Sequence, residues 1–585
     1  MINGTSTEWV ISRSEEATEE DFARALGVHP LTARILVRRG FDDFDTAEKF
    51  LNPSLRDMTD PFLMKDMDAA VLEILTALDR GEGILVYGDY DVDGVCSVSL
   101  LYEFLRRLGA RVEYFVPLRD QDGYGLNAGS VRRAAEAGQK LIVTTDCGVS
   151  NVEEIRLANE LGMRVVVVDH HTVPDELPPA AAILNPHRPD CPFPFKELAA
   201  VGVTFHLLVA LRARLREHGV FQHVPEPDLR EFLDLVALGT VADVVPLVDV
   251  NRTFVRLGLE VLGGRRRAGV SALIDRARVD GARVTPQTIS FRLAPRLNAA
   301  GRMGDASMCV QLLTTESYAE ALKLAKKLES LNDQRQECER EILEKVLPLA
   351  QIEADAGRRM LVVAGSTWHR GVLGIVASRL VEHFHRPSVL IGIDEDGLGR
   401  GSVRSIDGIN VIEILRSGAE LLETFGGHVA AAGLTVRAEN VEAIRERFDQ
   451  AMIRSLNGSE MPPRRLRIDC EVELAELDQR FATELTRLGP FGSGNREPVF
   501  LCRNSQATRV RVVGQNHLKA RFRDGSATLD GIGFSMADEK PVLNSAVSVA
   551  FVPRFANYRG QSRLEMHIRG LRPAKETCPD RVEHV

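Results

Sequence analysis

One seven-residue segment, GDYDVDG at residues 88–94, places three carboxylates at alternate positions directly after an apolar run. The run, Ile84-Leu85-Val86-Tyr87, is typical of a buried strand, and in an extended segment Asp89, Asp91 and Asp93 would share one face. Like charges at this spacing repel one another, so a fold that keeps them generally binds a divalent cation through their oxygens. The alternative is a solvated acidic turn, which the apolar flanks disfavour.

Three further segments supply residues of the same kind. TTDCG at 144–148 and DHH at 169–171 each follow a continuous apolar run rich in β-branched residues, which predicts buried parallel strands. Asp243 interrupts a fourth apolar segment at 236–247, where a cap or turn role is the simpler interpretation of that residue alone. Because sites form beyond the carboxyl ends of parallel strands, we expect the segments to meet in a two-metal site.

These segments resemble the DHH phosphoesterase superfamily. Three later segments are more specifically similar to its RecJ exonucleases: FRLAPRLNAAGR at 291–302, WHRGVLGIVA at 368–377 and GGHVAAAG at 426–433. Arg370 is a small departure, because the family more often has Gln, Glu or Pro there. The resemblance extends from about Leu36 to about Arg572. It implies a divalent-metal-dependent 5′→3′ exonuclease that degrades single-stranded DNA to mononucleotides in DNA repair and recombination.

The resemblance also implies roles for particular residues. The implied metal ligands are Asp91, Asp93, Asp146, His170 and Asp243. Asp146 would bridge two cations, and an oxygen-rich ligand set favours Mn²⁺ or Mg²⁺ over zinc. Asp89 and His171 complete the catalytic set, as ligands, as supporting groups or as an acid–base aid. Asp169 has the alternative of only orienting a histidine.

Basic segments are expected to hold the DNA strand. The implied DNA or phosphate contacts are Arg119, Arg296, Arg302, Ser402, Arg404, His428, Arg511, Lys519, Arg521 and Tyr558. Guanidinium groups match phosphate geometry, and the Gly-rich turn at 399–405 carries hydroxyls and arginines suited to a terminal phosphate. The structural alternatives are a solvated surface for Arg119, a salt bridge for Arg296 and a core position for His428.

Composition limits the class of protein. The net charge of −10 argues against a simple nucleic-acid coat protein, yet residues 501–572 hold 12 Lys/Arg against 5 Asp/Glu. Binding depends on such local charge, so a nuclease with a C-terminal DNA contact is compatible with the acidic chain. The eight cysteines include no CxxC pair, and no apolar run approaches the ~20 residues of a membrane span. With no signal-peptide pattern at the N-terminus, we expect a cytoplasmic protein.

The pattern along the chain predicts an α/β protein. Strands alternate with helical stretches in a parallel-sheet domain, a second α/β unit follows a long helix, and short strands at the end predict an OB-type β-barrel. The expected domains are an N-terminal helical segment at 1–59, a DHH catalytic domain at 60–300, a connecting helix at 301–357, a DHHA1-type domain at 358–458, an OB-type nucleic-acid-binding domain at 462–573 and a tail at 574–585. Asp45 and Glu48 predict a capping box at the start of a short helix.

Two other functions share part of this pattern. A DHH phosphodiesterase acting on short oligonucleotides or cyclic dinucleotides would have the same metal motifs, but such proteins typically lack the barrel. A catalytically inactive scaffold, as in eukaryotic replication relatives, would lack several of the carboxylates. The resemblance implies single-stranded DNA, a single-strand-binding protein and a helicase as partners, and no membrane. The sequence leaves open the cellular metal, the oligomeric state and whether RNA is cut.

Overall fold

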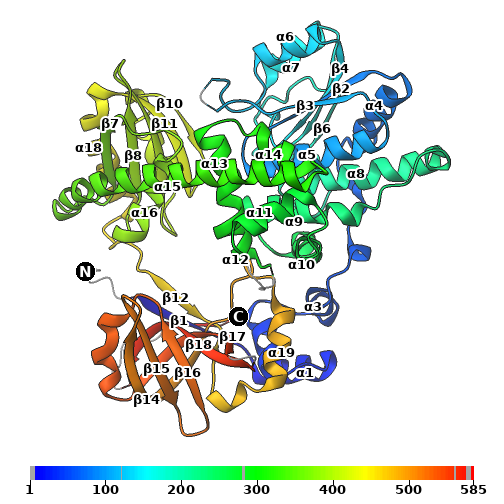
Figure 1. The fold of residues 1–585 in the computed structure, drawn as a ribbon. Coiled ribbons are helices and arrows are strands. Elements are labelled where there is room, and N and C mark those ends of the chain that lie inside the picture. The colour runs from blue at the N-terminus through cyan, green and yellow to red at the C-terminus, as the bar shows by residue number, and fades with distance from the viewer. Residues whose placement is uncertain (1–6, 120, 280–283, 559–560, 575–580, 585) are drawn as a thin grey trace. The chain divides into compact units, whose positions relative to one another are not determined.

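The computed structural model describes residues 7–119, 121–279, 284–558, 561–574 and 581–584 (Figure 1). The chain divides into two compact units. The larger unit consists of residues 9–298, 305–325 and 466–585, and the smaller unit of residues 1–8, 299–304 and 326–465.

A parallel sheet in the larger unit carries the residues predicted to bind metal. Its strand order is β3-β2-β4-β5-β6, with β2 at Gly83–Gly88, β3 at Val112–Phe115, β4 at Gln139–Thr145, β5 at Arg164–Val168 and β6 at Ala182–Leu184. The strands β2, β4 and β5 are almost wholly buried, as their continuous apolar runs predict.

Helices cover both faces of this sheet. The helices α6 (Ala128–Glu136) and α7 (Val152–Glu160) pack on the face that carries Tyr87 and Ile142. On the other side lie α4 (Met67–Asp79), α5 (Val92–Arg107) and α8 (Ala200–Glu217) (Figure 1). The helical elements that follow are α9 (Leu233–Ala242), α10 (Asp249–Gly263), α11 (Ala268–Arg276), α12 (Pro286–Thr288), the π-helix η5 (Ile289–Leu293), α13 (Ala294–Met303), α14 (Ser307–Thr314) and α15 (Tyr318–Asp355).

Two local predictions are wrong for physical reasons. The Asp triplet is not one extended segment, because Asp91 caps the N-terminus of α5 by accepting a hydrogen bond from the Gly94 amide, and the helix begins at Val92. Helix α3 (Phe44–Leu51) is capped by Asp43, which accepts from the Thr46 amide, so the expected capping box at Asp45 does not form.

The C-terminal part of the larger unit forms the predicted β-barrel. The strands β14 (Phe500–Val513), β15 (His517–Arg523), β16 (Thr528–Gly533), β18 (Gln561–Pro573) and β17 (Val547–Tyr558) pair in this order, and β17 returns to β14. Phe500, Phe522 and Phe551 fill its core. The short strand β13 (Cys470–Glu471) pairs with β14, and β12 (Arg465–Ile468), β1 (Glu8–Arg13) and β19 (Arg581–His584) form a separate sheet.

The N-terminal helices share the core of this barrel. Apolar residues of α1 (Glu16–Leu26), α2 (Pro30–Arg38) and α3 cluster with the barrel phenylalanines and with α19 (Gln479–Leu488). Arg252 of α10, only 1% exposed, donates hydrogen bonds to the carbonyls of Phe50, Leu488 and Arg487 at 2.9, 3.1 and 2.6 Å. These bonds join the helices behind the parallel sheet to both α3 and α19.

The smaller unit contains a mixed sheet of order β10-β11-β9-β8-β7. Its strands are β7 (Leu361–Ser366), β8 (Ser388–Ile393), β9 (Leu398–Arg404), β10 (Leu422–Gly427) and β11 (Ala431–Arg437), and its further helices are α16 (Leu373–Phe384), α17 (Val411–Arg416) and α18 (Val441–Leu456). The pair β7–β8 is parallel and the others are antiparallel.

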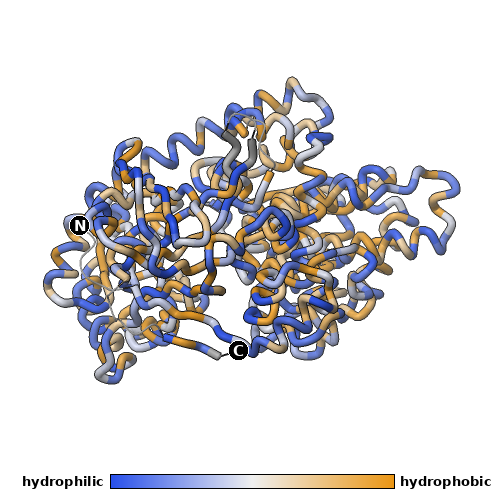
Figure 2. The backbone as a smooth tube through the Cα atoms, turned by 90° about the horizontal axis from the view of Figure 1, so that it is seen from below, coloured by the Kyte–Doolittle hydropathy of each residue, from blue (hydrophilic) through white to orange (hydrophobic). Residues whose placement is uncertain are grey.

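Apolar residues are distributed through every part of the described chain, alternating with polar ones along the backbone (Figure 2). Among the described helices, none combines the length and apolar character needed to cross a membrane.

Candidate metal centre and strand-binding residues

The carboxyl ends of β2, β4 and β5 meet at one edge of the parallel sheet. Asp89 follows β2, Asp146 follows β4, and His170 and His171 follow β5. Their ligand atoms form three groups, each within 4.8 Å: Asp89, Asp91 and Asp146; Asp146, His170 and His171; and Asp93, His170 and Asp243. Because Asp146 and His170 each belong to two groups, the seven residues predicted as the catalytic set make one cluster.

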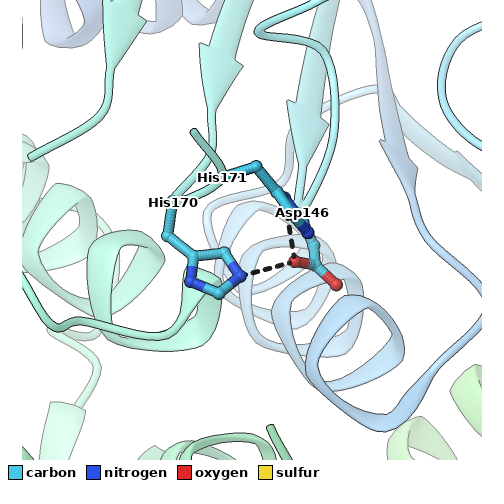
Figure 3. A group of neighbouring side chains, drawn as sticks. All are labelled: Asp146, His170 and His171. Atoms are coloured by element: carbon cyan, nitrogen blue, oxygen red, sulfur yellow. Dashed lines mark ion pairs between the residues drawn. The ribbon is translucent and has the colours of Figure 1, made fainter. Parts of the chain in front are cut away.

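Asp146 lies at the centre of the cluster. Its Oδ1 is 3.3 Å from His170 Nε2 and 4.0 Å from His171 Nδ1, and both histidines are drawn with ion pairs to it in Figure 3. The backbone of Asp146 has φ of +63°, a left-handed conformation that is uncommon outside glycine. Its amide donates to Val168 O at 2.9 Å, which holds this conformation at the strand end. Backbone strain of this kind concentrates at functional sites.

The helix α5 supplies two of the carboxylates. Asp93 lies in its first turn, and its side chain accepts hydrogen bonds from the amides of Ala200 and Val201, at 2.7 and 3.0 Å, at the N-terminus of α8. Each carboxylate oxygen retains a second lone pair for a cation. Gly94 is required here, because a Cβ would lie 2.5 Å from the backbone oxygen of Asp89.

Asp243 reaches the cluster from a helix. It is the C-cap residue of α9, and its Oδ2 is 3.7 Å from His170 Nε2. Asp243 therefore has the cap position that was the simpler interpretation of its sequence, and its side chain also lies in the cluster. The apolar segment around it is helix α9 over Leu233–Ala242 and not a strand.

The side chain of Asp169 is in direct contact with the imidazole of His171. Fully buried, it accepts hydrogen bonds from the amides of Val149, His170 and His171 at 3.0, 2.8 and 3.1 Å, and its Oδ1 is 2.7 Å from His171 Nδ1. Burial opposes its charge, but these hydrogen bonds prevail and lower the pKa of Asp169 to about 2. Its contacts match the orienting alternative stated from the sequence.

The other carboxylates are electrostatically strained without a cation. Burial, and then the neighbouring Asp91, raise the pKa of Asp93 to about 7, and burial with Asp93 and Asp91 raises the pKa of Asp243 to about 9. The pKa values of Asp89 and Asp146 are raised well above the ordinary carboxyl value, again by burial first and by adjacent carboxylates second. A divalent cation reverses this penalty, because it is the largest opposite charge that such a site can hold.

The two histidines differ in charge state. Burial and the neighbouring His171 lower the pKa of His170 to about 4, so His170 is neutral and able to ligate a metal. Burial also opposes the charge on His171, but its hydrogen bond to Asp169 and the surrounding carboxylates outweigh it and raise its pKa to about 9. In the absence of a cation, His171 is therefore the more readily protonated member of the pair.

Two buried polar atoms test whether a metal fits. Asp89 Oδ1 and His170 Nε2 make no hydrogen bond within the described part of the chain. Buried polar atoms of native proteins almost always find a partner, so both atoms are suited to contact a cation. Carboxylate oxygens with little imidazole and no thiolate suit Mn²⁺ or Mg²⁺. The residues fit the predicted cations.

Two further residues at the site were not identified from the sequence. Tyr124, on the loop between β3 and α6, places its hydroxyl 3.1 Å from His171 Nδ1. Asn298 of α13 accepts a hydrogen bond from the Val92 amide at 3.2 Å, beside Asp91. The sequence features that could have identified them are the position of Tyr124 between two glycines and the position of Asn298 between two arginines of the 291–302 segment.

The predicted arginines of the larger unit differ in their surroundings. The guanidinium carbon of Arg119 is 5.3 Å from the centre of the Tyr90 ring, and the charge of Arg119 acts on Asp89. This places Arg119 beside the cluster. Arg296 donates to the Arg292 carbonyl at 2.5 Å, one turn earlier in the helical segment.

Within the smaller unit, Ser402 and Arg404 lie together at the N-terminus of α16. Arg404 Nη1 is 3.1 Å from Ser402 Oγ, and a Cβ on Gly374 would lie 2.7 Å from Arg404 Nη2 and 3.0 Å from Ser402 Oγ. Arg302 donates to the Gly371 carbonyl at 2.7 Å. His428 is exposed at the turn between β10 and β11, so the core alternative for it is wrong.

The barrel contacts are only partly as expected. Arg511 is exposed, whereas Lys519 is paired with Glu565 at 3.1 Å and Arg521 with Asp530 at 2.7 Å. The side chain of Tyr558 lies outside the described residues. An aromatic group missed from the sequence surrounds Phe534, which is 54% exposed, with ring centres of His517 and His567 at 5.2 and 5.5 Å.

Comparisons with known proteins agree with the motifs. Models of the DHH family N-terminal domain, the DHHA1 domain and the RecJ OB domain match residues 83–240, 357–454 and 468–570. The chain is 38% identical over 563 residues to the single-stranded-DNA-specific exonuclease RecJ of Dickeya dadantii, covering 93% of this chain and 96% of that protein. The corresponding Escherichia coli protein is 36% identical over the same shares. This chain belongs to the RecJ family.

Solved RecJ structures share its fold. RecJ from Thermus thermophilus in complex with Mn²⁺ is similar with a TM-score of 0.82 and 32% identity, covering 96% of this chain and 79% of that chain. The same protein in complex with Mg²⁺ gives a TM-score of 0.77 and 30% identity, covering 98% and 79%. The predicted α/β architecture with DHH, DHHA1-type and OB-type parts is confirmed, and this RecJ-family chain is a hydrolase acting on phosphodiester bonds.

Proposed function

We propose that this chain degrades single-stranded DNA from its 5′ end to mononucleotides, in DNA repair and recombination in the cytoplasm. The observation that carries the proposal is the single cluster of carboxylates and imidazoles at the carboxyl edge of the parallel sheet. RecJ-family membership supports the substrate, because the curated relatives are named for single-stranded DNA.

The metal ligands of the proposal are the five residues that the family resemblance implies. Asp91, Asp93, Asp146, His170 and Asp243 would hold two divalent cations, Mn²⁺ or Mg²⁺, with Asp146 shared. Bound cations would supply a water nucleophile at neutral pH and shield the charge of the scissile phosphate. The Thermus thermophilus relative, solved with Mn²⁺ and with Mg²⁺, supports this choice of metal.

The remaining residues of the cluster would position and protonate the substrate. Asp169 would fix the orientation of His171, which would serve as an acid–base group for the departing 3′ oxygen. Arg119 lies where a guanidinium can contact a phosphate of the strand near Asp89.

A terminal phosphate would bind in the smaller unit. The N-terminal amides of α16, together with Ser402 and Arg404, offer a positive helix end, a hydroxyl and a guanidinium in one place. Replacing Arg404 by Lys should reduce the preference for 5′-phosphorylated over 5′-hydroxyl DNA by about tenfold, the value of one bidentate contact. Arg437→Lys, at an exposed position of β11 where the guanidinium pairs with Glu423, is the matched control.

The barrel would guide the strand, and partners would deliver it. Arg511, Lys519, Arg521 and Tyr558 are the proposed contacts there, with Arg296, Arg302 and His428 elsewhere along the strand. A single-strand-binding protein and a helicase are the proposed protein partners. The domain division at 1–59, 60–300, 301–357, 358–458, 462–573 and 574–585 is part of the proposal, and the matched ranges of the three family models support it.

Digestion of a single-stranded oligonucleotide, labelled at either end, tests the proposal. With Mn²⁺ or Mg²⁺, we expect immediate release of the 5′ label as a mononucleotide, and no release in EDTA or with Asp146→Ala. Release from the 3′ end first would contradict the proposed polarity. Cleavage of dinucleotides alone would instead identify a phosphodiesterase for short oligonucleotides.

A further inference from the structure

The loop that carries Tyr124 is built to hold one side chain in place. Tyr124 lies between Gly123 and Gly125, whose φ angles of +80° and +82° favour glycine. The fully buried Tyr87 donates its hydroxyl to the carbonyl of Gly125 at 2.8 Å. Both chain neighbours of Tyr124 thus adopt conformations that other residues rarely adopt, and one of them is fixed from the core.

A second anchor fixes the loop just beyond Gly125. The side chain of Asn151 accepts from the Leu126 amide at 3.1 Å and donates to the Leu126 carbonyl at 2.9 Å. A Cβ on Gly125 would lie 2.8 Å from Asn151 Oδ1, so the loop and Asn151 are in close contact. The position of Tyr124 is therefore determined by the sheet and by the turn before α7.

The hydroxyl of Tyr124 connects two parts of the metal cluster. It donates to the backbone carbonyl of Asp146 at 3.3 Å, and it lies 3.1 and 3.4 Å from the two ring nitrogens of His171. Nδ1 of His171 also lies 2.7 Å from Asp169 Oδ1, so the imidazole is held between this carboxylate and the tyrosine hydroxyl. A continuous chain of hydrogen bonds then runs from Asp169 through His171 and Tyr124 to Asp146.

The ring of Tyr124 does not explain why the residue is there. It is 52% exposed, so it contributes little to a hydrophobic core, while its hydroxyl reaches the cluster. Its ring packs edge-on against His171, with centres 5.6 Å apart. An exposed aromatic side chain held by two anchors and directed at an imidazole is more consistent with a role at the site than with a role in stability.

We propose that Tyr124 is a positioning residue for phosphodiester hydrolysis. Its hydroxyl contacts both the Asp146 carbonyl and the His171 ring, and it thereby fixes the orientation of the imidazole relative to the backbone of Asp146. The inference rests on the proposed exonuclease function and on the role of His171 in it.

Tyr124→Phe, which keeps the ring and removes the hydroxyl, is the direct test. We expect kcat on single-stranded DNA to fall about tenfold, equivalent to about 1.4 kcal/mol of barrier, with KM and the calorimetric affinity for Mn²⁺ unchanged. Tyr102→Phe is the matched control, since Tyr102 lies on α5 and pairs with the ring of Tyr114. An unchanged kcat in Tyr124→Phe would overturn the proposal.

Two further measurements separate a positioning role from other effects. In a His171→Gln background, adding Tyr124→Phe should cost no further activity; a full additional tenfold loss would show that Tyr124 does not act through His171. In the metal-free protein, the ¹⁵N signal of the His171 ring should shift in Tyr124→Phe and not in Tyr102→Phe. The absence of that shift would contradict the contact between Tyr124 and His171, and this readout does not depend on nuclease activity. Failure of the wild-type protein to cut DNA would instead refute the proposed function.

Discussion

The metal cluster and the C-terminal barrel differ in how their charged side chains are paired. In the cluster, carboxylates are buried beside one another, and their pKa values are raised because the described residues do not neutralise them. On the barrel, two of the basic side chains are paired with acidic ones, Lys519 with Glu565 and Arg521 with Asp530. A group of buried like charges is a good indicator of a ligand-binding site, whereas an ion pair on the surface says little about function. A local excess of basic residues is therefore a weaker indicator of function than a crowded group of like charges.

The largest effect should follow from removing the central carboxylate. Asp146→Asn keeps the size of the side chain but removes the charge shared by two of the groups, so activity should fall by more than about 100-fold, the upper end of losses for residues that only support a ligand. Steady-state hydrolysis of single-stranded DNA measures this. Asp538→Asn, on the exposed segment after β16, is the control and should retain wild-type activity. A loss below tenfold would contradict the central role proposed for Asp146 in the metal cluster.

Removing the orienting carboxylate should have the next largest effect. Asp169→Asn leaves the cluster charge intact but loses the charge-assisted bond to His171, so we expect a loss of about 10–100-fold in activity. The hydrogen bonds from three backbone amides should also weaken, and metal affinity by calorimetry reports whether the cluster itself is disturbed. Activity as low as that of Asp146→Asn would mean that Asp169 is itself a ligand.

The metal-free protein should lose stability as pH rises from about 6.5 to 9. The folded-state pKa values of Asp93 and Asp243, about 7 and 9, lie above the ordinary carboxyl value, and that of His171, about 9, lies above the ordinary imidazole value. The folded protein therefore binds more protons than the unfolded chain over this range, and its free energy of unfolding falls with rising pH.

Thermal unfolding in EDTA at several pH values checks this prediction. The midpoint should decrease toward pH 9, and Mn²⁺ should stabilise the protein most at the higher pH, where the carboxylates are ionised. Asp243→Asn should flatten the dependence. A midpoint that rises with pH in the metal-free protein would contradict the electrostatic description of the cluster.

The smallest effects should come from the barrel. Arg511→Ala removes an exposed guanidinium and should weaken binding of single-stranded DNA a few-fold, with a decrease of about 0.7 in the slope of log affinity against log salt. Arg521→Ala should weaken binding less than Arg511→Ala does, because the charge of Arg521 is already matched in part by Asp530. Fluorescence anisotropy across salt concentrations distinguishes the two. A larger loss for Arg521 would show that DNA displaces its acidic partner.

The sequence predicted the strand-end part of the cluster well. Asp89, Asp146 and His170 each follow a continuous apolar run, and parallel strands bring such ends together. The position of Asp243 at a helix end could not be predicted from the run around it, because short apolar segments suit a helix and a strand equally.

Other features depended on contacts distant in sequence. The pairing of Lys519 with Glu565 joins neighbouring parts of the barrel that are far apart along the chain, so composition could count the charges but not match them. The hydroxyl of Tyr124 reaches His171 only because Tyr87 and Asn151 fix its loop. Neither contact produces a periodic sequence pattern from which it could be predicted.

The most direct test of the account is anomalous diffraction from crystals of this protein grown with Mn²⁺. We expect two peaks about 4 Å apart in the cluster, one beside Asp91 and the other among Asp93, His170 and Asp243, with Asp146 between them. A single peak, or peaks away from these residues, would contradict the claim that the carboxyl edge of the parallel sheet is a two-metal centre.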